Sequence, residues 1–95
     1  EGRRLYGQTV PSELNDKELF TYRRPLGVVG AITAGNFPVA VPSWKIVPAV
    51  LCGNTVVWKP ASSAMFSAHY LMQLFEEAGI PPGVINFVAG IRFWF

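Results

Sequence analysis

The stretch TVVWKP at residues 55–60 indicates the fold, because it combines four residues that favour a β-strand with two residues that end it. Its first four residues are β-branched or aromatic, which favours a β-strand. Lys59 and Pro60 end that strand, since proline cannot donate to a sheet. Two further apolar runs, GVVGAI at residues 27–32 and VINFV at residues 84–88, have the same character. The continuous run at 27–32 predicts a strand that is buried on both faces.

A helical pattern separates each pair of predicted strands. Residues 39–51 form a mostly apolar helix, which contains Pro48 as a bend and ends at Gly53 in a left-handed conformation. The alternation of strand and helix predicts a parallel sheet with right-handed crossovers. The fold class is therefore α/β, with a partial doubly wound, Rossmann-like sheet.

The second predicted helix carries one apolar stripe at spacings of three and four residues. Ser62 or Ser63 is predicted to cap its N-terminus through a side-chain oxygen. Gly79 supplies the left-handed stop, and two prolines that follow it prevent the helix from continuing. The stripe consists of Ala64, Ala68, Leu71, Phe75 and Ala78.

Residues 1–24 differ from the rest of the chain because they carry most of its charged side chains. Short strand-like runs at residues 4–10 and 19–24 flank the turn-forming sequence PSELND, which predicts a β-hairpin. We therefore divide the chain into a hairpin at 1–24, a partial α/β domain at 25–90 and an atypical aromatic tail at 91–95. Two strands alone are marginal in water, so we expect the hairpin to lean on another sheet or subunit.

The composition describes one globular domain rather than a disordered chain, since 51% of its 95 residues are apolar and 15% are charged. A net charge of +2 gives little support for nucleic-acid binding. No apolar stretch reaches the roughly 20 residues that cross a bilayer, and no secretion signal is expected. The single cysteine, Cys52, excludes a disulfide framework and a multi-cysteine zinc site, so we expect a cytoplasmic protein without a metal.

Ligands of open α/β sheets lie beyond the carboxyl ends of the strands, which directs attention to Asn36 and Lys59. No GxGxxG phosphate loop precedes a helix, which disfavours a small independent nucleotide-binding module. Each candidate also has a plain structural explanation. Asn36 suits a turn, Lys59 suits a solvated strand end and Ser62 suits a helix cap. We expect Cys52 to behave as a small hydrophobe and His69 to lie near the surface.

An ordered series of short motifs resembles the aldehyde dehydrogenase superfamily along nearly the whole chain. The hairpin contributes GQTVP at residues 7–11, which is similar to the oligomerisation region of that family. The motifs of the α/β part are PLGVVG at 25–30, NFP at 36–38, GNTVV at 53–57, KP at 59–60 and EAGIPPGVIN at 77–86. Their order and mutual spacing carry the resemblance.

The resemblance implies NAD(P)-dependent oxidation of an aldehyde to a carboxylic acid. Asn36 matches an asparagine whose amide donates to the oxyanion formed when a cysteine thiolate attacks the aldehyde. Lys59 matches a lysine that binds the hydroxyls of the adenosine ribose. Ser62 stands where many relatives carry a glutamate that repels a 2′-phosphate, so the implied cofactor is NADP or NAD. Residues 57–65 are similar to enzymes that act on semialdehydes. Further matches to cofactor contacts are Ile32, Thr33 and Ala34.

Two departures from the family pattern bear on function. Gly35 replaces a tryptophan that many relatives have immediately before the asparagine. The nucleophilic cysteine and general-base glutamate of the family are expected beyond Phe95, so we expect an N-terminal-side fragment that does not catalyse alone. The complete enzyme is expected to be a homo-oligomer, either a dimer or a tetramer. The alternative is a catalytically silent truncated protein that acts only through subunit association.

Overall fold

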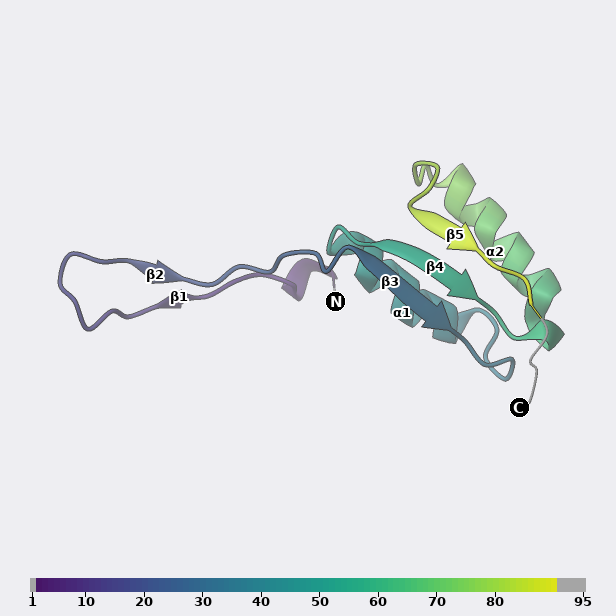
Figure 1. Ribbon diagram of the computed structural model, residues 1–95, viewed down its shortest axis with the longest axis horizontal. Helices are drawn as coiled ribbons and strands as arrows, with labels where there is room; N and C mark the ends of the chain where they lie inside the picture. Colours follow the sequence, from purple (N-terminus) through teal and green to yellow (C-terminus); the bar gives the residue numbers. More distant parts are fainter. Residues whose placement is uncertain (1, 91–95) are drawn as a thin grey trace.

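The computed structural model describes residues 2–90. These residues form a two-stranded hairpin followed by a three-stranded sheet with two helices (Figure 1). The aromatic tail predicted at residues 91–95 lies outside the described residues. In chain order the elements are η1 (Gly2–Arg4), β1 (Thr9–Val10), β2 (Leu19–Phe20), β3 (Val28–Ile32), α1 (Ala40–Leu51), β4 (Thr55–Lys59), η2 (Ser62–Ala64), α2 (Met65–Glu77) and β5 (Ile85–Phe87).

The hairpin is an extended arm that projects from the α/β part (Figure 1). β1 and β2 pair antiparallel, with Thr9 opposite Phe20 and Val10 opposite Leu19. All four of these side chains are exposed, so the arm has no core of its own. The arm gives the chain a longest dimension of 59 Å and a radius of gyration of 17.7 Å, against about 12 Å for a compact domain of this length. The expected hairpin is confirmed.

The α/β part is built on a parallel sheet with the strand order β3-β4-β5. Val29 pairs with Val56, and Val56 pairs with Ile85, so the three strands share one register. Each crossover carries one helix, and two successive right-handed crossovers place α1 and α2 on the same face of the sheet (Figure 1). The α/β class with a parallel sheet is confirmed.

The core lies between this face of the sheet and the two helices. Alternate strand residues point into it, as a sheet with one covered face requires. Trp58 packs edge-on against Phe87, with 5.7 Å between the ring centroids. α2 is the longest helix with 13 residues, and none of the helices within residues 2–90 could cross a membrane. The buried cluster consists of Ala31, Ile46, Val56, Trp58, Ala68, Leu71 and Ile85.

The opposite face of the sheet is open in the described part of the chain. Val28 is 73% exposed and Ile32 is 76% exposed, so the prediction that this strand is buried on both faces is wrong within residues 2–90. The physical reason is that both helices cover the same face and β3 is an edge strand. Val57, on the central strand, is also exposed on this side. A doubly wound sheet carries a second layer of helices on such a face.

Both helices end just before the glycines predicted to stop them. Gly53 and Gly79 follow α1 and α2 with φ angles of +82° and +85°, the left-handed region that glycine adopts without a steric penalty. The Ile80 N–H donates to the Phe75 carbonyl oxygen at 3.1 Å, which completes the C-terminal turn of α2. Pro48 lies inside α1, as expected.

The predicted serine cap of α2 is wrong. Ser62 and Ser63 lie in the short 3-10 turn η2, and α2 has no side-chain cap hydrogen bond. The Ser62 hydroxyl instead donates to the Gly90 carbonyl oxygen at 3.3 Å, which ties η2 to the segment after β5. Ala78 is exposed because α2 ends there, so the apolar stripe stops at Phe75.

Candidate cofactor site

A cavity of about 830 Å³ lies at the carboxyl ends of β3 and β4. The parallel register places Ile32 opposite Lys59, which brings the last residues of the two strands to the same edge. This is where open α/β sheets bind their ligands. All five residues predicted to contact the cofactor line the cavity, together with three small neighbours. The lining consists of Ile32, Thr33, Ala34, Gly35, Lys59, Ala61, Ser62 and Ser63.

The wall formed by residues 33–35 is fixed by two hydrogen bonds to β4. The Thr33 backbone N–H donates to the Lys59 carbonyl oxygen at 3.1 Å, and the Trp58 indole N–H donates to the Thr33 hydroxyl oxygen at 3.0 Å. Thr33 is 5% exposed and Trp58 is fully buried. The Thr33 hydroxyl is therefore engaged with the core, which leaves mainly the backbone of this wall to face a ligand.

Lys59 supplies the positive charge of the cavity. Its side chain is half-buried, and its methylene stem runs close to Gly90, where an added Cβ would lie 3.5 Å from Cε. Within residues 2–90 its ammonium makes one long hydrogen bond, to the Pro60 carbonyl oxygen at 3.4 Å. An ammonium has three donors, so most of its capacity is left for a ligand. None of the described lining residues is acidic.

Gly35 lets the turn after β3 approach η2 closely. A Cβ atom added at Gly35 would lie 2.5 Å from the Ser63 hydroxyl oxygen and 3.4 Å from the Ala61 Cβ. The turn after β3 therefore packs directly on η2. A tryptophan at this position, as the resemblance would place it, requires the Ser63 side chain to move.

Asn36 is the one predicted site residue that does not line the cavity. It is exposed in the bend between Gly35 and Pro38, ahead of α1. Its side-chain amide makes no hydrogen bond with another residue in the 2–90 range, so both amide protons are available to a ligand. The structure thus brings the cofactor candidates together and places Asn36 directly after Gly35, the last residue of the loop after β3 that lines the cavity.

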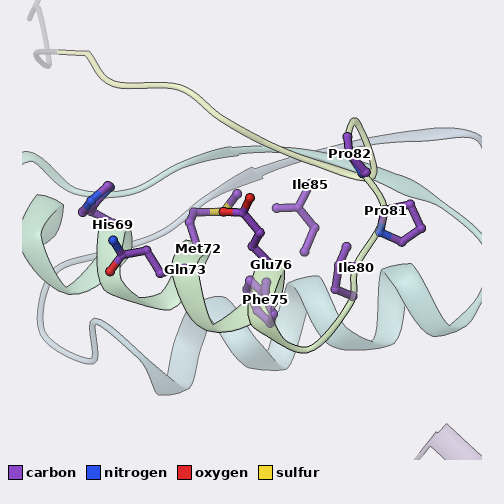
Figure 2. A pocket seen from close by; sticks show the side chains of 9 residues that line it. All are labelled: His69, Met72, Gln73, Phe75, Glu76, Ile80, Pro81, Pro82 and Ile85. Carbon is purple, nitrogen blue, oxygen red and sulfur yellow. The ribbon is translucent and has the colours of Figure 1, made fainter.

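A second hollow of about 220 Å³ lies between α2 and the segment that leads into β5 (Figure 2). Its floor is apolar, with Met72, Phe75 and Ile85 among the lining residues, and the polar His69 and Glu76 belong to α2. His69 is exposed, as expected. No cluster of three metal-ligating side chains occurs among residues 2–90. This hollow contains none of the predicted site residues.

Sequence reasoning missed Asn54, which is only 7% exposed. Its side-chain oxygen accepts from the Leu26 and Gly27 N–H groups at 2.6 and 3.0 Å. Its side-chain nitrogen donates to the Ala49 carbonyl oxygen at 3.0 Å. Asn54 thereby ties the start of β3 to the end of α1. A polar residue directly after a helix-ending glycine has the appearance of an ordinary loop residue, so the sequence carries no signal for this role.

The comparison with protein families decides where the chain belongs. The model of the aldehyde dehydrogenase family matches residues 1–92, nearly the whole chain. The chain belongs to the aldehyde dehydrogenase family. The resemblance inferred from the motifs is thus confirmed.

Individual relatives of this family cover the same region. The α-ketoglutaric semialdehyde dehydrogenase of Bacillus subtilis (strain 168) is 52% identical over 90 residues, covering 95% of this chain and 18% of the relative. The crystal structure of an E. coli NADP-dependent enzyme matches with a TM-score of 0.85 and 45% identity, covering 95% of this chain and 19% of that one.

An NAD-dependent benzaldehyde dehydrogenase from Corynebacterium glutamicum matches with a TM-score of 0.80 and 42% identity, covering 94% of this chain and 19% of that one. The solved relatives of this aldehyde dehydrogenase chain therefore include both an NADP-dependent and an NAD-dependent enzyme. The chain spans less than a fifth of the length of each of these three relatives.

Proposed function

We propose that this chain supplies part of the NAD(P) site of an enzyme that oxidises an aldehyde to a carboxylic acid. The observation that carries the proposal is the cavity of about 830 Å³, because the five cofactor candidates converge on it from β3, β4 and η2. The family membership makes this reaction the relevant one. When bound, NAD(P) would supply the hydride acceptor for the oxidation.

The cavity fits the adenosine end of a dinucleotide. The Lys59 ammonium makes one hydrogen bond within residues 2–90, which leaves donors for the ribose hydroxyls, and Ile32 and Ala34 offer an apolar wall. Ser62 is small, neutral and exposed, so it would not repel a phosphate on the ribose. The absence of acidic residues among the described lining residues favours acceptance of NADP as well as NAD.

Asn36 is proposed to donate its side-chain amide to the oxyanion that forms when a thiolate adds to the aldehyde carbonyl. Its amide has no competing partner within residues 2–90. Removing one such donor typically costs a factor of about 10²–10³ in kcat. By the family resemblance, the cysteine that supplies the thiolate and the glutamate that activates water lie outside these 95 residues. A semialdehyde is the proposed substrate, because the Bacillus relative acts on one by its name.

The test is a titration of the 95-residue chain with NADP and with NAD, following the thermal unfolding temperature. A ligand that binds only the folded state raises that temperature in a saturable way. Lys59→Ala should abolish the shift. Lys45→Ala is the matched control, because Lys45 is an exposed lysine on α1 that does not line the cavity. Equal shifts in the two variants would refute the assignment of Lys59.

A second candidate function is association with other subunits without catalysis. The observation that favours it is the open face of the sheet, where Val28 and Ile32 are more than 70% exposed. Large exposed apolar patches mark surfaces that bind other proteins. A homo-oligomer that uses the hairpin and this face is therefore part of the proposal. Concentration-dependent sedimentation with no dinucleotide-induced shift in unfolding temperature would favour this candidate over the enzyme.

A further inference from the structure

A buried hydrogen bond joins the core of the sheet to the wall of the cofactor cavity. Trp58 is fully buried in the centre of the core, and its indole N–H donates to the Thr33 hydroxyl oxygen at 3.0 Å. Thr33 follows directly after β3 and is a lining residue of the cavity. The bond therefore connects the largest fully buried side chain within residues 2–90 to a lining residue of the proposed site.

The geometry on both sides of this bond is constrained. Trp58 is held edge-on against Phe87, with an interplanar angle of 83°. The Thr33 backbone N–H donates to the carbonyl oxygen of Lys59, the next residue along β4. Two neighbouring residues of β4 thus hold the backbone and the side chain of Thr33. The direction in which the chain leaves β3 is set by these two bonds.

The Trp58 indole N–H has one hydrogen-bond acceptor within residues 2–90, the Thr33 hydroxyl oxygen. A buried indole N–H without an acceptor is costly, so packing alone would be served better by phenylalanine at position 58. The Thr33 hydroxyl could otherwise turn toward the cavity and serve a ligand. Its bond with Trp58 holds the Thr33 hydroxyl oxygen toward the core.

We propose that Trp58 is a positioning residue for the cofactor site, which acts through the Thr33 hydroxyl to hold residues 33–35 against η2 in the arrangement that receives the dinucleotide. The proposal rests on the proposed function. It assigns to Trp58 no contact with the cofactor. Its effect is to keep the wall in place before the ligand arrives. Binding then costs less conformational entropy, which increases the affinity.

The experiment compares Thr33→Val, Trp58→Phe and the double variant in the 95-residue chain. Each single variant removes one partner of the bond while keeping most of the side-chain volume. We expect NADP to bind about tenfold more weakly to Thr33→Val, as loss of one buried hydrogen bond implies. The double variant should bind no more weakly than Thr33→Val, because the two residues act through one bond. Thr33→Ser restores the acceptor and should bind within about twofold of the unaltered chain.

A matched control separates positioning from general stability. Thr55→Val makes the same change at the other end of the sheet, where the Thr55 hydroxyl donates to the Gly27 carbonyl oxygen at 3.5 Å. The structural readout is the set of backbone amide NMR signals of residues 33–35 without ligand. Thr33→Val and Trp58→Phe should move these signals in the same direction, and Thr55→Val should leave them unchanged.

The outcomes distinguish this proposal from the proposed function. If Lys59→Ala abolishes NADP binding while Thr33→Val binds as tightly as the unaltered chain, the role of Trp58 is overturned and the cofactor site stands. If the unaltered chain binds no dinucleotide, the proposed function fails. The amide signals then test by themselves whether Trp58 positions residues 33–35. Unmoved signals for residues 33–35 in both single variants would overturn the positioning role in either case. Signals that move in both variants would support it.

Discussion

Asn54→Ala tests whether one buried side chain joins α1 to β3. The Asn54 side chain makes three hydrogen bonds, to the Leu26 and Gly27 N–H groups and to the Ala49 carbonyl oxygen. Alanine removes all three and leaves the Leu26 and Gly27 N–H groups without a hydrogen-bond partner within residues 2–90, whereas the Ala49 carbonyl oxygen still accepts from the backbone N–H of residue 54 at 3.0 Å. Because the first two bonds cross from one element to another more than twenty residues away, the variant loosens the point where β3 begins.

The magnitude follows from the number of bonds and from their exposure. A typical protein hydrogen bond contributes about 1 kcal/mol net, and a buried group left unpaired costs about 1–3 kcal/mol. Leu26 is almost fully exposed, so water can replace the bond to its N–H. We therefore expect a loss of about 2–3 kcal/mol in the free energy of unfolding. For a chain of this length, such a loss corresponds to a fall of about 10–20 °C in the unfolding temperature.

The assay is urea unfolding followed by circular dichroism, with Asn36→Ala as the matched control. Asn36 is exposed and its amide makes no hydrogen bond within residues 2–90, so this variant should change the free energy of unfolding by less than about 0.5 kcal/mol. A loss in Asn54→Ala no larger than that of the control would refute the reasoning that Asn54 joins the two elements.

Three further predictions concern packing, turn geometry and association. Trp58→Ala should cost about 3–5 kcal/mol in unfolding free energy, whereas Trp44→Ala, at a position 69% exposed, should change it little; urea unfolding compares the two. Gly79→Ala should cost about 1–2 kcal/mol because its φ is +85°, while Gly30→Ala, with open space around its Cβ position, should be nearly neutral by the same assay. Val28→Lys should lower the sedimentation coefficient at high protein concentration, since it places a charge on the exposed edge strand; an unchanged concentration dependence would contradict a role for this edge in association.

Most of the fold could be predicted because it depends on local signals. The apolar run at 55–58, the helix-ending glycines and the alternation of strand and helix each have a direct physical cause in a few neighbouring residues. The failures concern features that depend on the rest of the fold. Serine is a common helix-capping residue, but Ser62 lies in a 3-10 turn ahead of α2 and its hydroxyl donates to the Gly90 carbonyl oxygen. The exposure of Val28 depends on which neighbours the sheet has, and no local pattern carries that information.

In the candidate site, too, features with a local sequence signal could be predicted and features that depend on distant residues could not. The end of β4 at Lys59 and the end of β3 at Ile32 could be located from sequence, and the parallel register then brings them together. The partners that hold the site in place could not be located, since Thr33 and Trp58 are 25 residues apart and meet through a side-chain bond. Asn54 likewise bonds to Gly27 and Leu26, which lie 27 and 28 positions before it in the sequence.

The two missed residues act at opposite ends of β3, and this has a consequence for the site. Asn54 fixes where the strand begins, and Trp58 fixes how the chain leaves it. Within residues 2–90, β3 is otherwise an edge strand with one covered face, and no strand pairs with its outer edge. Because Asn54 and Trp58 hold β3 at its two ends, the strand can keep the cavity wall in position although no strand pairs with its outer edge within residues 2–90. We therefore expect Asn54→Ala to weaken NADP binding as well as stability, by less than Thr33→Val does, because it releases the far end of the strand from the site. Binding measured well below the unfolding temperature of each variant tests this order, and the reverse order would contradict it.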